Sequence, residues 1–381
     1  MSRVVRLVAM GLLAAGGGLP PVYAGGPPPP AEMRLSALPA TVPTPADNPT
    51  TPAKIALGRL LFFDPILSST RQVSCATCHN PRFGWTDGRA TPIGIGGAGA
   101  GPARTLQASA PLLTRNVPTL LNVGFNGLVA GAQPDPAAAP MFWDSRVLSL
   151  EQQVLTPLRS SGEMRGDDCP EDRSVAEAVG RVAAIGEYQG WFSSAFGPST
   201  NPAVTATHLV QAVAAFERSL VTTRTAVDRF LAGDDTALTA TQRQGLRVFQ
   251  DAGCIQCHGG PMFTDYKLHF IGVSDSTADG RRAFRTPSLR NLRATAPYMH
   301  NGGLRTVREV LVFYDQLAEA VSESLDGADQ PQQPALDPLL RPLDLNPEDF
   351  PALEAFLDAL SSDDYDRTVP VKVPSGLAVI P

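Results

Sequence analysis

The stretch SCATCHNP, residues 74–81, contains two cysteines three residues apart, and a histidine follows the second one directly. The same arrangement returns in CIQCH, residues 254–258. The chain has only five cysteines and five histidines among 381 residues, so these two short segments hold four of the cysteines and two of the histidines. A duplication of such sparse residues indicates that both segments perform the same chemistry.

C-x-x-C-H is the attachment signature of a c-type haem. The two thiols form thioethers with the vinyl groups of the haem, and the adjacent histidine becomes the proximal ligand of the iron. The predicted haem-binding residues are Cys75, Cys78 and His79 for the first haem, and Cys254, Cys257 and His258 for the second.

Two other kinds of site use cysteine and histidine. Zinc binds both residue types, but a zinc site does not need a histidine immediately after the second cysteine in both copies. A redox-active C-x-x-C pair explains neither the histidine nor the duplication. We therefore predict two covalently attached haems.

The first 24 residues have the pattern of a cleaved signal peptide. Arg3 and Arg6 precede an apolar run over residues 7–19, and Val22-Tyr23-Ala24 is a small-x-small cleavage pattern. The run is too short to span a bilayer, and no later segment reaches about 18 uninterrupted apolar residues. The mature protein is expected in the periplasm, without a membrane span.

The net charge restricts the partners. Removal of the signal peptide leaves 29 basic and 37 acidic residues, a net charge of −8. This charge argues against nucleic acid as a partner. It permits a basic redox partner, although an acidic surface is also a common way to keep a protein soluble.

The composition divides the mature chain into segments. Residues 25–50 are rich in proline and alanine and are expected to form an extended tether. Each half of the remainder contains one haem motif, so we predict an N-terminal haem domain over residues 51–233 and a C-terminal haem domain over residues 234–365. A tail follows over residues 366–381, and the last helix has the length to pack back on the first domain.

Helix signals surround both motifs, whereas strand alternation is scarce. The predicted fold class is therefore mainly α, with two cytochrome c-like haem domains, long loops and little β structure. The expected helices begin at Thr51-Pro52, at the capping box Thr239-x-x-Gln242 and at Asn346-Pro347, and the longest helical pattern covers residues 206–231.

A set of further segments is similar to landmarks of the bacterial diheme cytochrome c peroxidase and MauG superfamily, in the same order. The set covers nearly the whole mature chain. Its members are LGRLLFFDPILS (57–68), SCATCHNP (74–81), WTDGR (85–89), RNVPTLLN (115–122), MFWDSR (141–146), the EQQ segment (151–153), Glu163-Met164, TPSLRN (286–291) and APYMHNGG (296–303).

The resemblance implies that the first haem is the site of reaction with hydrogen peroxide and the second a low-spin electron store. Cleavage of an O–O bond requires a proton to move between the oxygens. Glu163 falls on the position of the catalytic glutamate of the family, and Gln153 and Pro157 fall on positions that line the same pocket. The local sequence of Glu163 on its own favours a solvated loop acid, and its position in the family pattern favours the catalytic role instead.

Two further roles follow only from the resemblance. Trp143 matches a tryptophan that lies between the two haems and relays electrons, although its local sequence also suits a core residue. Asn116, Thr295 and Pro297 match a calcium site between the domains, and oxygen ligands suit that ion.

Two departures point to the MauG-like branch, of which the methanobactin-associated enzyme MbnH is an example. Ile95 stands where the better-known peroxidases carry a histidine that ligates the resting peroxide-reactive haem, so the first haem is expected to be five-coordinate or water-bound. Tyr314 stands where those peroxidases carry a methionine ligand of the second haem.

The helix that carries Tyr314 can be predicted from its own sequence. Thr306-x-x-Glu309 resembles a capping box, and the apolar residues that follow place Tyr314 on the buried face. A buried tyrosine can also serve only as a hydrogen-bonding group, and Met299 is the alternative ligand. Other residues with ligating side chains are expected to be structural or have no visible partner: Cys169, His208, His269 and His300.

We therefore expect a periplasmic diheme enzyme that reacts with hydrogen peroxide at the first haem and oxidises a protein partner. One alternative is a cytochrome c peroxidase that takes electrons from a small cytochrome c or a cupredoxin. An alternative of another class is a diheme electron carrier or redox sensor, which needs no peroxide pocket.

Overall fold

The computed structural model describes residues 30–107, 113–198, 203–274, 280–326, 336–341 and 343–379. This part of the chain is mainly helical, which confirms the predicted fold class. The helices are α1 (Pro52–Phe63), α2 (Cys75–Cys78), α3 (Leu150–Arg159), α4 (Glu171–Ala183), α5 (Gly186–Phe196), α6 (Ala206–Arg218), α7 (Ala226–Leu231), α8 (Ala240–Asp251), α9 (Val307–Asp326) and α10 (Phe350–Asp358).

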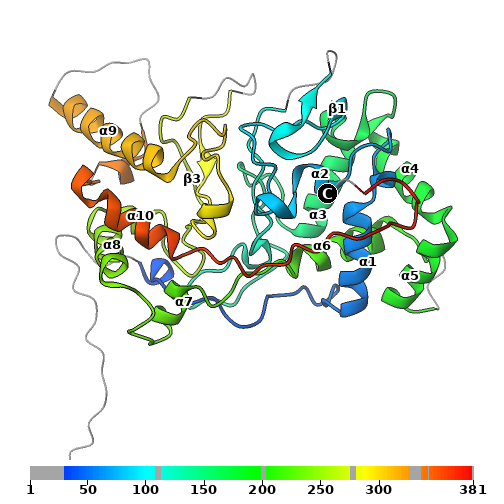
Figure 1. Ribbon diagram of the computed structural model, residues 1–381, viewed down its shortest axis with the longest axis horizontal. Coiled ribbons are helices and arrows are strands. Elements are labelled where there is room, and N and C mark those ends of the chain that lie inside the picture. Colours follow the sequence, from blue (N-terminus) through cyan, green and yellow to red (C-terminus); the bar gives the residue numbers. More distant parts are fainter. Residues whose placement is uncertain are drawn as a thin grey trace, which may run out of the picture.

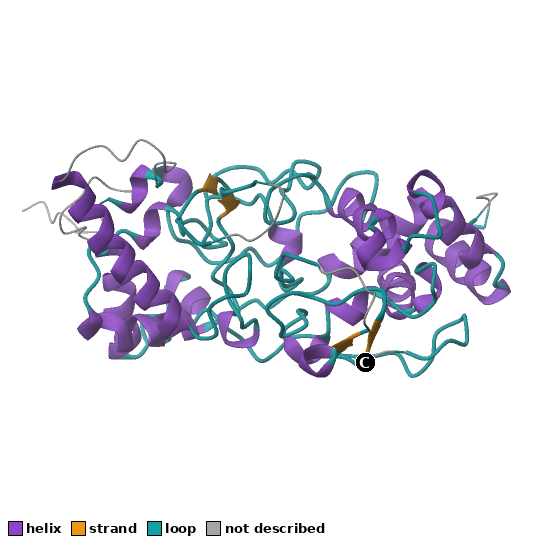
Figure 2. Ribbon diagram, turned by 90° about the horizontal axis from the view of Figure 1, so that it is seen from above, coloured by secondary structure: helices purple, strands orange, loops and turns teal. Residues whose placement is uncertain are grey.

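The β structure that the model describes is limited to short antiparallel pairs. Strand β1 (Gly97–Ala98) pairs with β2 (Thr105–Leu106), and β3 (Leu268–His269) pairs with β4 (Phe284–Arg285). Helices lie at the two ends of the molecule, with long loops between them (Figures 1 and 2). The predicted signal peptide lies outside the described residues, and none of the described helices is long and apolar enough to cross a membrane.

One helix crossing occurs in each half of the molecule. A Cβ atom added to Gly58 of α1 would lie 2.0 Å from the carbonyl oxygen of Ala212 in α6. A Cβ atom added to Gly245 of α8 would lie 1.9 Å from the carbonyl oxygen of Ala352 in α10. Only glycine permits two helix backbones to approach this closely. The same crossing therefore organises both halves, which we call the first unit and the second unit.

Three aromatic rings pack beside each crossing. In the first unit the Phe62 ring lies 5.2 Å from Phe216 and 5.7 Å from Trp85. The second unit repeats this arrangement, with its rings 5.2 to 6.2 Å apart, in Phe249, Phe263 and Phe356. Rings at these separations in edge-on or tilted orientations attract each other beyond their burial alone.

The helix starts agree with the sequence signals, but one predicted helix is interrupted. The side chain of Thr51 accepts from the amide of Lys54, and Thr239 and Gln242 form the predicted capping box. The expected single helix over residues 206–231 is wrong, because the chain leaves helical geometry between α6 and α7. The β-branched run Val221-Thr222-Thr223 lies in this break, where the Thr222 amide donates to Asn122 (2.7 Å) rather than to a helix carbonyl.

The expectation of a free tether is wrong for residues 30–50. Met33 is buried, and its carbonyl accepts a hydrogen bond from Gly260 of the second unit (3.0 Å). The amide of Leu38 donates to Asp228 (3.1 Å). Asn48 is fully buried and bonds to Glu151 of α3 (2.7 Å). Apolar and amide side chains between the prolines therefore hold an extended segment on both units.

The positions of α7 and α10 also differ from those predicted from the sequence. Val227 of α7 packs in the apolar core of the second unit, although it precedes the boundary expected at residue 233. Helix α10 packs on α8 within the second unit. The segment that returns to the first unit is the tail after α10, which runs across the molecule in red in Figure 1 and buries Val373 in the core of the first unit.

We expect Gly245→Ala to destabilise the second unit strongly, because the added methyl group meets backbone rather than a movable side chain. The expected cost is about 1–3 kcal/mol or more. Gly180→Ala is the matched control, because Gly180 is an exposed glycine inside α4 with no atom within 4 Å of an added Cβ. The control should gain up to about 1 kcal/mol from the higher helix propensity of alanine. Thermal unfolding of both variants measures the difference, and an equally small effect of both would contradict the close crossing.

Candidate active site

A single cavity connects the two predicted haem sites. Its lining is mostly apolar, which suits a large apolar macrocycle. Both proximal histidines line it, together with Trp143, Gln153, Tyr314 and the alternative ligand Met299, whereas Pro157, Glu163 and Ile95 are not among its lining residues.

His79 is held in the form that binds iron. The short helix α2 begins at Ser74, where Ser74 and Thr77 form a capping box, and it delivers His79 directly after its last residue. Burial lowers the pKa of His79 to about 4, partly offset by the backbone carbonyls of Trp85 and Pro118. The ring is therefore neutral near pH 7. Its Nδ1 lies 3.1 Å from the Trp85 carbonyl, and a hydrogen bond there leaves Nε2 as the ligating atom.

His258 repeats this arrangement in the second unit. Its Nδ1 lies 3.2 Å from the carbonyl oxygen of Phe263, and burial again lowers the pKa of the imidazole. Both histidines thus bond the carbonyl of a buried aromatic residue that follows within the next six positions.

The four motif cysteines are unsuited to act as thiolates. Burial raises the pKa of Cys75, Cys254 and Cys257 to about 12 each, and it raises that of Cys78 further. A zinc site needs thiolates. Neutral sulfur in an apolar environment is instead compatible with thioether attachment, so the environment of the cysteines favours haem over zinc.

The loop after the first motif packs directly on the turn that carries Glu163. The Ile95 amide donates to the Gly162 carbonyl (3.0 Å), and a Cβ atom added to Gly94 would lie 2.1 Å from the same oxygen. Glu163 lies in the π-helical turn Ser161–Arg165. Burial raises the pKa of Glu163, with Arg146 and the Ser160 hydroxyl acting against it. A carboxyl group in this environment holds its proton to a higher pH than a solvated one.

Gln153 presents an unsatisfied polar atom to the cavity. Its Oε1 is buried and has no hydrogen-bond partner among the described residues. Such an atom costs about 1–3 kcal/mol unless something pairs with it. Pro157 lies one turn later on the same helix, α3. We infer that the amide of Gln153 is kept for a bound molecule.

Trp143 lines the cavity that both proximal histidines also line. Its indole nitrogen donates to the Asn116 carbonyl (2.8 Å). Its ring centroid lies 6.5 Å from that of His300, and the His300 ring stacks on Phe284 at 3.6 Å. The indole is therefore fixed in orientation, and aromatic rings extend from it toward the second unit.

Tyr314 and Met299 both line the cavity with His258. Helix α9 begins at Val307 as predicted, with the Thr306 hydroxyl accepting from the Glu309 amide (3.1 Å). The second bond of the predicted capping box is displaced by one residue, because Glu309 accepts from the Arg305 amide instead. Burial raises the pKa of Tyr314, so its phenolate form requires a compensating positive charge such as ferric iron.

Known proteins resemble this chain in sequence and in architecture. Residues 52–236 match the family model described as di-haem cytochrome c peroxidase. The methylamine utilization protein MauG of Methylorubrum extorquens is 34% identical over 87% of this chain and 85% of its own. The cytochrome c551 peroxidase of Nitrosomonas europaea is 30% identical over 87% of both chains. A solved MauG-like protein associated with microbial copper homeostasis superimposes with a TM-score of 0.66 and 27% identity, over 86% of this chain and 95% of that one.

The chain belongs to the diheme cytochrome c peroxidase and MauG family. This result confirms the resemblance found in the sequence, and it makes the protein a diheme oxidoreductase. The family carries two haems. The site has the features that such a group requires: two neutral buried histidines, protonated cysteines and an apolar cavity that holds the unpaired Gln153 oxygen.

The three residues of the predicted calcium site line the same cavity of this family member. The Asn116 side-chain amide donates to the Arg89 carbonyl (2.9 Å), which leaves its oxygen as the ligating atom. The Thr295 hydroxyl lies 3.4 Å from the Leu292 carbonyl, and Pro297 follows two residues later. The calcium site stays a prediction.

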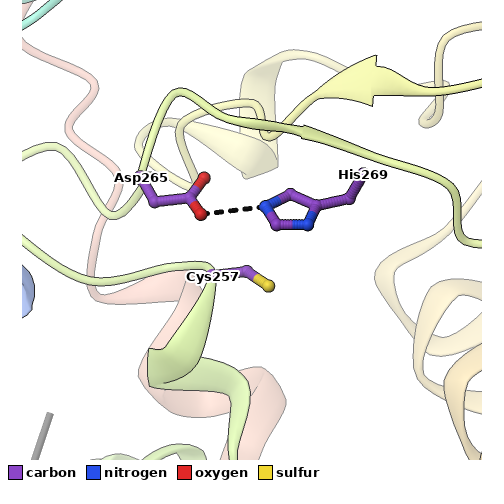
Figure 3. A group of neighbouring side chains, drawn as sticks. All are labelled: Cys257, Asp265 and His269. Atoms are coloured by element: carbon purple, nitrogen blue, oxygen red, sulfur yellow. Dashed lines mark hydrogen bonds and ion pairs between the residues drawn. The ribbon is translucent and has the colours of Figure 1, made fainter. Parts of the chain in front are cut away.

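A group of ionisable side chains next to Cys257 was not singled out from the sequence. His269 bonds to Asp265 through Nε2 (2.8 Å) and to Asp337 through Nδ1 (2.6 Å), as Figure 3 shows for the first pair. The hydrogen bond to Asp265, followed by that to Asp337, raises the pKa of His269 against the effect of burial. Cys257, Asp265 and His269 lie close enough to hold a metal ion. Because both imidazole nitrogens are occupied, we assign the group as an ion-paired network.

Glu217 is a second residue that the sequence analysis missed. It is 3% exposed on α6, and its Oε2 has no partner among the described residues. Burial raises its pKa to about 8, with Arg218 acting against this shift and Glu151 adding to it. Glu217 is close enough to Cys75 to raise the pKa of that thiol as well. It is therefore a protonated carboxyl group beside the first haem attachment.

The remaining candidates have structural contacts. The Cys169 thiol is buried and lies 3.2 Å from a carboxylate oxygen of Glu177. His208 stacks on Phe196 at 4.2 Å and bonds to the Ala203 carbonyl (2.8 Å).

The raised pKa of Glu217 predicts a specific pH dependence of stability. The unfolded chain loses the proton of this group near its ordinary pKa, whereas the folded chain keeps it up to about pH 8. Glu217 therefore lowers the free energy of unfolding progressively as the pH rises from about 4.5 to 8. Glu217→Gln removes this loss, on the order of 2 kcal/mol at pH 8.

Thermal unfolding of the holoenzyme at pH 5 and pH 8 measures the effect. The variant should lose less stability than wild type between these values, while the exposed Glu187→Gln should behave as wild type. Parallel pH profiles for Glu217→Gln and wild type would contradict the raised pKa.

Proposed function

We propose that the protein is a periplasmic MauG-like enzyme, which reacts with hydrogen peroxide at the first haem and oxidises a residue of a protein partner. The placement of the five histidines carries this proposal. Two are the proposed proximal ligands, while His208 stacks on Phe196, His269 bonds to two carboxylates and His300 stacks on Phe284. The sequence has no histidine between His79 and His208, and Ile95 stands where the resemblance would place a second histidine ligand of the first haem.

An open coordination position suits reaction without a preceding activation step. When bound, the haem supplies the iron at which peroxide binds and loses its O–O bond. Glu163 provides the proton transfer between the two oxygens, since burial keeps its pKa raised. We propose that the Oε1 of Gln153 accepts a hydrogen bond from the bound molecule, and the resemblance places Pro157, one turn later on α3, near the same pocket.

The second unit supports storage of the oxidising equivalents. Trp143 donates to the Asn116 carbonyl and lines the same cavity as both proximal histidines, and we propose that it relays electrons between the haems. Tyr314 is proposed as the ligand opposite His258. A phenolate is a hard anionic ligand that favours oxidised iron, whereas the thioether of Met299 favours the reduced state. A low reduction potential of the second haem suits oxidation of a protein residue better than collection of electrons from a carrier.

The relatives also support a second candidate function. Both a MauG and a cytochrome c551 peroxidase match over most of the chain. The alternative is thus a peroxidase that draws electrons from a small cytochrome c or cupredoxin. The unpaired Gln153 and the buried Glu163 argue against a simple diheme electron carrier, because such a carrier needs neither group. A calcium ion held by Asn116, Thr295 and Pro297 is part of the proposal.

Glu163→Gln should slow the consumption of hydrogen peroxide by about 10²–10⁴-fold, because it removes the proton-transferring group. The resting absorption spectrum should hardly change, since Glu163 is not a ligand. Asp168→Asn is the matched control: Asp168 is an exposed acid five residues later, and its replacement should leave the rate unchanged. Glu163 would be only a loop acid if both variants reacted at the wild-type rate.

Tyr314→Phe should abolish the low-spin signature of the second haem in the ferric enzyme, and Tyr314→Met should raise the reduction potential of that haem. Electron paramagnetic resonance and spectroelectrochemical titration measure the two effects. Met299→Ala is the control and should leave the low-spin signal intact. The reverse result, with loss of the signal in Met299→Ala alone, would favour the peroxidase function over the MauG-like one.

A further inference from the structure

The residue that holds each proximal histidine adopts a strained backbone conformation. Trp85 has φ 61° and Phe263 has φ 54°, the left-handed region, and both side chains are fully buried. Bulky residues rarely occur there, because the conformation is strained for them. In both units the carbonyl of this residue faces Nδ1 of the histidine, at 3.1 and 3.2 Å. The repeated strain accompanies a repeated task, the orientation of the imidazole.

The sequence repeats around these residues as well. Trp85-Thr86-Asp87 and Phe263-Thr264-Asp265 are both an aromatic residue followed by threonine and aspartate. Phe263 packs against two phenylalanines at its helix crossing. Trp85 packs against Phe62 and Phe216 at 5.7 Å each and also against Phe63 at 6.2 Å. Because phenylalanine fills this position in the second unit, ring packing alone does not require a tryptophan in the first.

The indole nitrogen is what distinguishes Trp85. It donates a hydrogen bond to the backbone carbonyl of Asp366 (3.0 Å), in the tail that returns from the second unit. Phe263 has no corresponding donor. A continuous path therefore runs from the tail through the indole to the Trp85 backbone, and from the Trp85 carbonyl to His79.

The tail is anchored firmly on both sides of this contact. The side chain of Asp366 pairs with Arg59 of α1, and Arg59 also donates to the Thr368 carbonyl (3.1 Å). Further along, the Ser375 hydroxyl donates to the buried carboxylate of Asp64 (2.6 Å). Between these points the side chain of Val373 is 3% exposed. The Asp366 carbonyl is thus a fixed acceptor.

We propose that the C-terminal tail, residues 364–376, is a positioning element for the proximal ligand of the first haem, acting through Trp85 on His79. The hydrogen bond at Nδ1 controls how strongly an imidazole donates electrons to a metal at Nε2. The tail, which begins in the second unit, therefore tunes the iron of the first unit. The haem at His258 has no such connection.

Trp85→Phe tests this role, because it removes the indole donor and keeps an aromatic ring that the fold accepts in the second unit. Resonance Raman spectra of the reduced holoenzyme report the iron–histidine vibration, and spectroelectrochemical titration reports each potential without peroxide. In the variant the vibration of the first haem should move to lower frequency and its potential should rise. The second haem should be unchanged. Trp191→Phe, at a partly buried tryptophan of α5, should change neither quantity.

Deletion of residues 365–381 is the second test. The shortened chain should show the same shift at the first haem, and adding Trp85→Phe to it should produce no further shift, since both changes remove one connection. A wild-type potential and vibration in a folded Trp85→Phe protein, or equal shifts at both haems, would overturn the proposal. If the shortened chain fails to fold, the Trp85→Phe result decides alone.

This inference depends on a first haem bound to His79 but not on peroxide chemistry. A first haem that is six-coordinate in wild type and variant would contradict the proposed open site, while a rise of its potential in Trp85→Phe would still support the role of the tail.

Discussion

The close contact between two helix backbones in each unit is the constraint on which the other features depend. At Gly58 and Gly245 even a methyl group has no space, so α1 meets α6 and α8 meets α10 almost without intervening side chains. The contact brings three aromatic rings together beside each haem motif, and one ring of each set belongs to the residue that orients the proximal histidine. The contact between the helix backbones thus positions the aromatic residue, and the carbonyl of that residue orients the proximal histidine.

Burial then determines the protonation states of the site. The same loss of hydration that lowers the pKa of His79 raises the pKa of the motif cysteines and of Glu163. The imidazole becomes a neutral ligand, the sulfurs stay uncharged and the carboxyl group can hold a proton. These states need no dedicated charge partner, because one apolar environment produces all of them.

The sequence predicts those parts of the molecule that depend on neighbouring residues. The haem motifs, the cap at Thr239 and the start of α9 are local patterns, and the structure agrees with each. The packing of residues 30–50, the return of the tail and the isolation of Glu217 depend on contacts between residues far apart in the sequence, such as Trp85 with Asp366 or Leu38 with Asp228. Composition describes such segments as linkers because it carries no information about what they touch.

The two units share one architecture, and the differences between them indicate which residues serve the function of each unit. Each has a glycine crossing, three rings and a histidine bonded to a strained aromatic residue, which together suffice to hold a haem. The first unit adds the Glu163 turn against Ile95, where a second histidine ligand is missing, and the second unit adds Tyr314. In the proposed function the first haem keeps an open position for peroxide, and the phenolate of Tyr314 favours the oxidised state of the second haem. A duplicated fold serves both purposes only if its two copies differ on the side of the haem site opposite the proximal histidine. The side that carries the proximal histidine is alike in both units, except that the tail contacts Trp85 in the first.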